Sequence, residues 1–257
     1  MGMKLVILAG GLGTRLREET EFKPKPMVEI GGKPIIWHIM SGYATCGITD
    51  FVICTGYKGE IIRNYFTNLD SNTSNFTINY KPNKEISIHN VFKESDWKIT
   101  LVDTGPKTNT GGRVFLAEEF LENETFACTY GDGLSNVDIN SLLEFHKSHK
   151  RIATMTIVRP NSRFGVVSHE NGLVTEFEEK PISKAWINAG FFIFEPGIFN
   201  YMDADCVLES SVLVNLTNDS QLMAFEHSGF WQAMDTYRET MLLNELWESG
   251  NAPWKTW

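Results

Sequence analysis

The feature that most constrains the fold is a regular alternation of apolar runs and helical patterns between residues 4 and 158. The run Lys4–Ala9 is continuously apolar and stops at Gly10-Gly11, which is typical of a strand buried on both faces. Alternation of such runs with helices predicts a mostly parallel sheet in three layers. We expect strands at Lys4–Ala9, Phe51–Thr55, Ile99–Val102, Phe126–Tyr130 and Ile152–Val158, and helices at Lys33–Cys46, Gly59–Asn68, Arg113–Phe120 and Ile139–His149.

The second half of the chain changes character. Short apolar runs at Val166–Val167, Leu173–Glu178 and Ile187–Phe194 follow each other closely, which predicts antiparallel additions at one edge or mouth of the sheet. Two more helices are expected near Glu209–Leu216 and Tyr237–Ser249. We interpret residues 1–257 as one α/β domain, with a hairpin insertion around 70–98 and a distinct part around 159–235.

Composition excludes two classes of partner. The net charge of −9 argues against nucleic acid, because proteins that bind a duplex need a basic face. No segment approaches the ~18 consecutive apolar residues of a membrane helix, so we expect no membrane partner. The first apolar run is too short for a signal-peptide core, and the four cysteines form no metal-binding or CxxC spacing. We therefore expect a cytoplasmic protein.

A glycine-rich loop follows the first strand, from Leu8 to Arg15. Its three glycines allow a sharp turn whose free N–H groups can bind phosphate, although a tight turn without a ligand is the simpler alternative. The sequence lacks the G-x-x-x-x-G-K-[ST] of a P-loop, and Leu16 stands where a dinucleotide fingerprint needs its third glycine. The loop alone therefore indicates phosphate binding without naming the ligand.

Charged residues near this loop strengthen that interpretation. In Lys23-Pro24-Lys25-Pro26 the prolines disfavour a helix, so we expect a stiff, extended segment that fixes a lysine beside a triphosphate. A solvated charged loop is the alternative. Asp132 lies between two glycines after a predicted strand, where a carboxylate can enter a cleft and bind Mg²⁺; a simple turn is again the alternative. Asp235 could bind the same metal or cap the helix near Tyr237.

Together these motifs resemble a known family. L-A-G-G-x-G-T-R-L followed by K-P-K-P-M is similar to the signature of the sugar-1-phosphate nucleotidyltransferases. T-G-G-R at 110–113, Y-G-D-G at 130–133, E-K-P at 179–181, N-A-G-F-F at 188–192 and G-F-W-Q-A-M-D-T at 229–236 extend the resemblance over nearly the whole chain. They are most similar to the branch of the family that uses CTP and glucose 1-phosphate.

The resemblance implies a Rossmann-like nucleotidyltransferase fold, a role for each matching position, and a homo-oligomer, specifically a hexamer. Catalytic roles fall on Arg15, Lys25 and Asp132, and Asp132 and Asp235 would bind Mg²⁺. The sugar phosphate would contact Lys180, Asn188 and Gly190, within the part around 159–235. The nucleotide would contact Leu8, Ala9, Gly10, Gly11, Leu12, Gly13, Thr14, Arg15, Lys25, Thr108, Arg113 and Gly131.

The chemistry of this family suits such residues. A sugar 1-phosphate, with a second pKa near ~6, is already a nucleophile at neutral pH. Its difficulty is to approach a tetra-anionic triphosphate, so cations and alignment matter more than a general base. Three alternatives stay open at this point: another triphosphate or sugar 1-phosphate, a non-catalytic nucleotide-sugar binding protein, and an NAD-dependent oxidoreductase, which the incomplete fingerprint disfavours.

Overall fold

A seven-stranded mixed sheet forms the centre of the computed structural model, which describes residues 2–80, 82, 84–89, 94, 96–162 and 164–257, with residues 15, 17 and 18 described by their backbone alone. In sheet order the strands are β14 (Leu222–His227), β10 (Ala153–Val158), β13 (Ile187–Phe194), β8 (Phe126–Tyr130), β1 (Lys4–Ala9), β4 (Asp50–Thr55) and β7 (Lys98–Asp103). β13 alone runs antiparallel to its neighbours among these strands.

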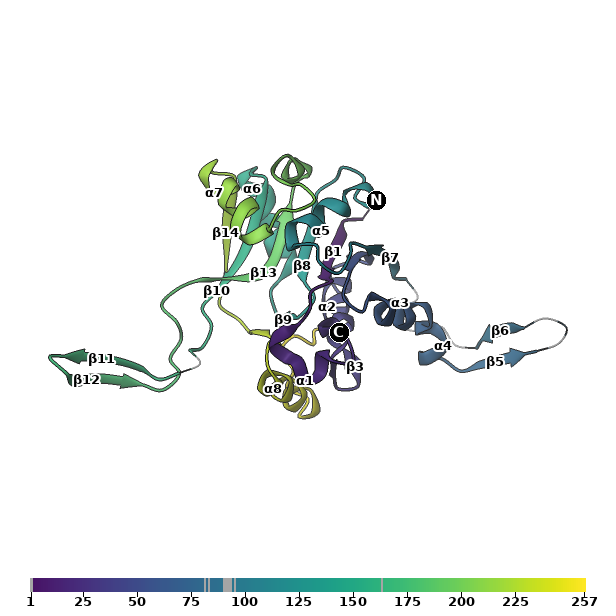
Figure 1. Cartoon of the computed structure of the whole chain (residues 1–257), viewed down its shortest axis with the longest axis horizontal. Helices are drawn as coiled ribbons and strands as arrows, with labels where there is room; N and C mark the ends of the chain where they lie inside the picture. Colours follow the sequence, from purple (N-terminus) through teal and green to yellow (C-terminus); the bar gives the residue numbers. More distant parts are fainter. Residues whose placement is uncertain (1, 81, 83, 90–93, 95, 163) are drawn as a thin grey trace.

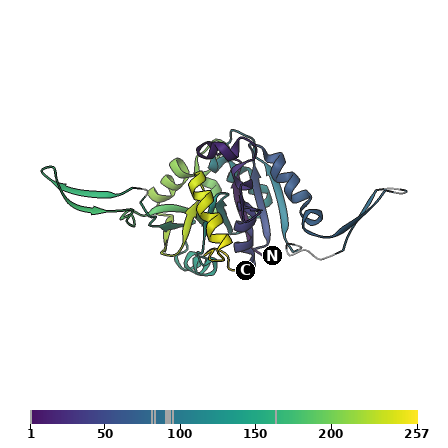
Figure 2. The ribbon, with the colours of Figure 1, turned by 90° about the horizontal axis from the view of Figure 1, so that it is seen from below.

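Helices cover both faces of this sheet, as the side-chain alternation along β1 requires. Leu5 and Ile7 pack on one face with α2 (Ile35–Ala44), α3 (Gly59–Thr67), α6 (Ile139–His149) and α8 (Tyr237–Glu248). Val6 and Leu8 pack on the other face with α5 (Thr110–Leu116), the π-helical turn η5 (Leu208–Val212) and α7 (Leu213–Asn218). Figure 2 shows the sheet between these two layers. The expected three-layer α/β fold is confirmed.

The first half of the chain follows the expected pattern closely. Every predicted strand and helix there is present within a few residues, and the helix Ile139–His149 has the predicted bounds. One helix differs, because α5 begins at Thr110 and ends at Leu116, where a separate 3₁₀ turn (Glu118–Phe120) takes over.

The expected position of Ile187–Phe194 at an edge or mouth of the sheet is wrong. β13 lies in the middle of the sheet, with β8 on one side and β10 on the other. Its last six residues are buried, which is the pattern of a central strand covered on both faces. The edge position belongs instead to β14, a strand that we did not predict.

Two hairpins project from opposite ends of the body (Figure 1). β5 (Phe76–Asn79) pairs with β6 (Glu85–Ile88) inside the segment 70–98, and β11 (Val166–Glu170) pairs with β12 (Leu173–Glu178) at the other end. The described part of the chain holds no helix with the length and apolar character needed to cross a membrane. Shorter elements connect these strands and helices: η1 (Thr14–Leu16), α1 (Arg17–Thr20), η2 (Lys25–Met27), β2 (Glu29–Ile30), β3 (Lys33–Pro34), α4 (Leu69–Thr73), β9 (Gly133–Ser135), η4 (Pro196–Tyr201) and β15 (Trp231–Ala233).

Candidate active site

A cavity of about 500 Å³ opens beyond the carboxyl ends of the neighbouring strands β1 and β8. In sheets of this kind ligands bind where strand ends meet loops, so this is the expected place for a site. Residues that we predicted from the sequence line much of it: Leu8, Ala9, Gly10, Gly11, Gly13, Thr14, Lys25, Thr108, Arg113, Gly131, Asp132 and Asp235. The cavity also includes residues that we did not predict, which are Pro26, Asn109, Thr110, Tyr130, Val207 and Glu209.

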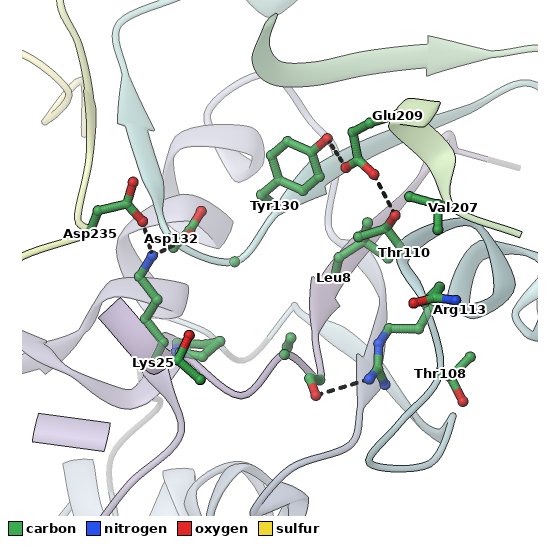
Figure 3. A pocket seen from close by; sticks show the side chains of 18 residues that line it. Leu8, Lys25, Thr108, Thr110, Arg113, Tyr130, Asp132, Val207, Glu209 and Asp235 are labelled. Carbon is green, nitrogen blue, oxygen red and sulfur yellow. Dashed lines mark hydrogen bonds and ion pairs between the residues drawn. The ribbon is translucent and has the colours of Figure 1, made fainter. Parts of the chain in front are cut away.

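Lys25 joins two carboxylates from distant parts of the chain (Figure 3). Its Nζ lies 2.6 Å from Oδ2 of Asp132 and 2.7 Å from Oδ1 of Asp235. The lysine side chain is 11% exposed, whereas those of Asp132 and Asp235 are 30% and 18% exposed. Burial lowers the pKa of Lys25, but the two carboxylates outweigh burial and raise its pKa above the ordinary value of 10.5. The ammonium group therefore stays charged at neutral pH.

The chain holds Lys25 by a short turn, which corrects the expected extended segment. Lys25–Met27 form the 3₁₀ turn η2, preceded by Pro24 in an extended conformation. A proline lacks an N–H, and the first turn of a helix does not need one, so Pro26 is tolerated there. The turn is buried, which excludes the alternative of a solvated charged loop.

A two-stranded ribbon brings the two carboxylates together. β9 follows Asp132 and pairs antiparallel with β15, so that Gly133 lies opposite Ala233. The N–H of Met234 donates to the carbonyl of Asp132 at 2.9 Å, and Asp235 follows directly. The helix α8 is capped by Thr236, in a capping box with Glu239, so the Asp235 carboxylate is not needed as the N-cap.

The glycine loop is held from behind by a buried arginine. Nη2 of Arg113 donates to the carbonyl of Gly10 at 3.0 Å, and Nη1 donates to the carbonyl of Gly105 at 2.9 Å and to Oγ1 of Thr104 at 2.5 Å. A Cβ atom on Gly10 would lie 2.0 Å from Nη1, so only glycine permits this approach. Burial lowers the pKa of Arg113. Its guanidinium group is bound to two backbone carbonyls and to the Thr104 hydroxyl, and Arg113 thus positions the loop.

Some predicted residues do not line the cavity. The side chain of Leu12, within the loop, is exposed, and Lys180 is exposed with Nζ 3.3 Å from Oε1 of Glu179. Asn188 lies at the border, because its Nδ2 donates to the Tyr130 hydroxyl at 3.2 Å, and the N–H of Gly190 donates back to Oδ1 of Asn188. Arg15 belongs to η1, and its side chain lies outside the described residues.

The sequence reasoning missed the wall of the cavity that faces the glycine loop. Glu209 accepts hydrogen bonds from the hydroxyls of Thr110 and Tyr130, and the three residues lie together in Figure 3. Thr110 and Tyr130 stand inside motifs that we quoted, so their positions carried a signal. Glu209 stands in no such motif, and nothing local in the sequence distinguishes it from other exposed carboxylates.

The two carboxylates are also the candidate ligands for a metal ion. Asp132 and Asp235 offer hard oxygen atoms that converge on one point, as Mg²⁺ requires. The described residues contain no group of three or more His, Cys, Asp and Glu side chains that could hold a metal. One or two protein carboxylates, completed by phosphate oxygens and water, is the usual arrangement for Mg²⁺ bound with a nucleotide. The residues present fit that ion.

Comparison with known proteins agrees with this geometry. The family model described as nucleotidyl transferase matches residues 4–232. The glucose-1-phosphate cytidylyltransferases of Salmonella typhi and Salmonella typhimurium are each 50% identical to this chain, over 99% of it and 100% of their own length. A solved structure of UDP-glucose pyrophosphorylase complexed with UDP-glucose has a TM-score of 0.70, covering 97% of this chain and 100% of that one. At 17% identity, that likeness supports the fold alone.

Proposed function

The chain belongs to the nucleotidyl transferase family, and on that premise we propose that it transfers a cytidylyl group from CTP to α-D-glucose 1-phosphate. The products are CDP-glucose and pyrophosphate. The observation that carries this proposal is the group Lys25, Asp132 and Asp235 on the wall of a cavity formed by the glycine loop. Full-length identity of 50% to two cytidylyltransferases supports the choice of substrates.

The reaction is a single displacement at the α-phosphorus of CTP. A phosphate oxygen of glucose 1-phosphate forms a bond to this phosphorus, and the bond from it to the bridging oxygen of the β-phosphate breaks. Pyrophosphate leaves with the electron pair. The attacking group is already an anion, so the site needs no general base.

Lys25 supplies the fixed positive charge in this scheme. Its buried ammonium group, held at the cavity wall by η2, stabilises negative charge that develops on the α-phosphate oxygens. In the structure the same ammonium is bound to Asp132 and Asp235. When CTP enters, the Lys25 side chain rotates so that its ammonium group meets the α-phosphate, and Asp132 and Asp235 would then be available to hold a metal ion.

Mg²⁺, when bound, supplies a Lewis acid that neutralises phosphate oxygens and helps to align them. Asp132 and Asp235 would hold it. The backbone N–H groups of Gly11, Gly13 and Thr14, which line the cavity, bind the β- and γ-phosphates, and Arg15 follows next in the sequence as a further positive charge. Arg113 keeps the loop in its phosphate-binding shape through the carbonyl of Gly10.

The acceptor sugar binds beside Tyr130, where Asn188 and Gly190 border the cavity. Lys180 is exposed and forms an ion pair with Glu179, whose side chain is exposed too, so Lys180 can move to bind the sugar phosphate. We further propose that 159–235 forms the sugar-binding part of one domain, and that the chain forms a homo-oligomer, a hexamer. Sedimentation velocity of the purified protein measures the number of chains in this oligomer.

One experiment tests the proposed activity. The purified protein is incubated with Mg²⁺, each of CTP, UTP, dTTP and GTP, and either glucose 1-phosphate or mannose 1-phosphate, and pyrophosphate release is followed. We expect the highest kcat/KM for CTP with glucose 1-phosphate. Equal or greater turnover with another pair reassigns the substrate, and no pyrophosphate from any pair with folded protein rules out the activity.

A further inference from the structure

An anionic side chain lies on the wall of a cavity that must accept a polyanion. Glu209, at the start of η5, lines the cavity on the side that faces the glycine loop (Figure 3). Within the described residues no Lys, Arg or His side chain forms an ion pair with it. The proposed substrate carries four negative charges on its phosphates, so Glu209 repels that half of the molecule.

The hydrogen bonds of Glu209 leave it as a pure acceptor. Its Oε2 accepts from Oγ1 of Thr110 at 2.6 Å, and its Oε1 accepts from the hydroxyl of Tyr130. Thr110 in turn accepts from the N–H of Leu208 at 3.0 Å, and Tyr130 accepts from Nδ2 of Asn188. Both hydroxyl hydrogens therefore point at the carboxylate, and the carboxylate itself offers a ligand only lone pairs.

The carboxylate still has acceptor capacity for a ligand. An ionised carboxylate has about four lone-pair sites, of which Thr110 and Tyr130 use two. Burial and the Glu209 carboxylate raise the pKa of Tyr130, so that hydroxyl remains protonated and continues to donate. A substrate group placed against Glu209 must consequently be a neutral hydrogen-bond donor.

From this arrangement, and resting on the proposed function, we propose that Glu209 is a specificity-determining residue that reads the nucleoside half of the triphosphate by accepting a hydrogen bond from it. Lys25 and Glu209 then fix the orientation of the nucleotide, with phosphates near the ammonium group and the nucleoside near the carboxylate. The shared chemistry is an N–H or O–H donor on the nucleoside. CTP has three such donors, of which the 3′-hydroxyl is shared with UTP and dCTP, and two distinguish CTP from a competitor: the 4-amino group of cytosine and the 2′-hydroxyl of ribose.

Each of these two donors excludes a different competitor. Uracil presents an O4 acceptor where cytosine presents its amino group, so a carboxylate at that position would reject UTP. A deoxyribose lacks the 2′-hydroxyl, so a carboxylate at that position would lose its bond to the nucleoside with dCTP. Either hydrogen bond would give Glu209 a role in selecting the nucleotide, which is a reason to keep a carboxylate in a cavity that accepts a polyanion.

The test uses Glu209→Gln, which keeps the size of the side chain and replaces one acceptor by a donor. We measure kcat/KM for CTP, UTP and dCTP, and KM for glucose 1-phosphate, in the wild type, this variant and Glu248→Gln. Glu248 is exposed at the end of α8 and does not line the cavity, so it is the matched control. Glu209→Asp, with thermal unfolding of all variants, separates a change of selectivity from a folding defect.

We expect the preference for CTP over one competitor to fall about 10- to 100-fold in Glu209→Gln, with Glu248→Gln unchanged. A fall against UTP assigns the bond to the cytosine amino group, and a fall against dCTP assigns it to the ribose hydroxyl. An equal change for all three nucleotides, or a change confined to KM for glucose 1-phosphate, overturns the proposal. Wild-type activity with CTP is measured in the same series, so a failure of the proposed function is seen separately.

Discussion

Replacing Lys25 by methionine removes a buried charge and keeps the length of the side chain. Both Oδ2 of Asp132 and Oδ1 of Asp235 lie within 2.7 Å of Nζ, so these two oxygens are at most about 5 Å apart. Two unit charges at that separation repel by about 3 kcal/mol at an effective dielectric constant of 20. Without the ammonium group, this repulsion stays uncompensated until another cation arrives.

Two consequences follow for Lys25→Met. Its kcat falls by about 10²- to 10³-fold, the scale of losing one preorganised contact to a charge that develops in the transition state. Added Mg²⁺ without nucleotide raises the melting temperature of the variant more than that of the wild type, because in the wild type the ammonium group already occupies the place between the carboxylates.

The assays are pyrophosphate release at saturating substrates and thermal unfolding over a Mg²⁺ titration. Lys98→Met is the matched control, because Lys98 pairs with one carboxylate, Asp50, at 2.8 Å while its side chain is 65% exposed. We expect wild-type kcat and a wild-type response to Mg²⁺ from this control. The reasoning is refuted if a folded Lys25→Met protein keeps wild-type kcat, or if Mg²⁺ stabilises it no more than the wild type.

Further predictions concern the metal ligand, the loop and a buried histidine. Asp132→Asn lowers kcat by about 10²-fold or more in the pyrophosphate assay; an unchanged kcat would remove Asp132 from the metal site. Gly10→Ala lowers the free energy of unfolding by about 1–3 kcal/mol, because its Cβ would lie 2.0 Å from Nη1 of Arg113, whereas Gly11→Ala, with no atom within 4 Å, changes it little. Urea titrations compare the two, and equal values would contradict the close approach. Burial lowers the pKa of His38 to about 4, although its hydrogen bond to the carbonyl of Ile30 partly opposes this. The imidazole is thus neutral in the folded state at neutral pH and takes up a proton on unfolding. The free energy of unfolding therefore decreases as the pH falls from 6.5 toward 4. An NMR titration that places this pKa near 6.5 would contradict the assignment.

The layered sheet could be predicted because its signals are local. The run Lys4–Ala9 and its successors are continuous apolar strands separated by helical patterns, and each burial pattern can be read within a few residues. Ile187–Phe194 was misplaced because sequence spacing shows that strands are near each other but not which strands they pair with. Its burial on both faces, visible in I-N-A-G-F-F-I-F, was the available signal for a central position.

The candidate site was predictable only where motifs marked it. The glycine loop and G-D-G stand at strand ends, so their positions followed from the sequence. The meeting of Asp132 with Asp235 depends on the pairing of β9 with β15, a contact between residues about a hundred positions apart that no local pattern encodes. The expectation of an extended segment around Lys25 treats both prolines as helix breakers, although a first helical turn accepts them. The position of Glu209 in the cavity is apparent only from its hydrogen bonds to Thr110 and Tyr130 in the folded chain.

The central claim is that fixed positive charge and alignment drive one direct displacement at the α-phosphorus, with no covalent intermediate on the protein. The stereochemical course of the reaction tests this most directly, with CTP made chiral at the α-phosphorus by sulfur substitution, glucose 1-phosphate as acceptor, and ³¹P NMR of the sugar-nucleotide product. A single in-line attack predicts inversion of configuration at that phosphorus. Retention would show two successive displacements through a group on the enzyme, and would contradict the account.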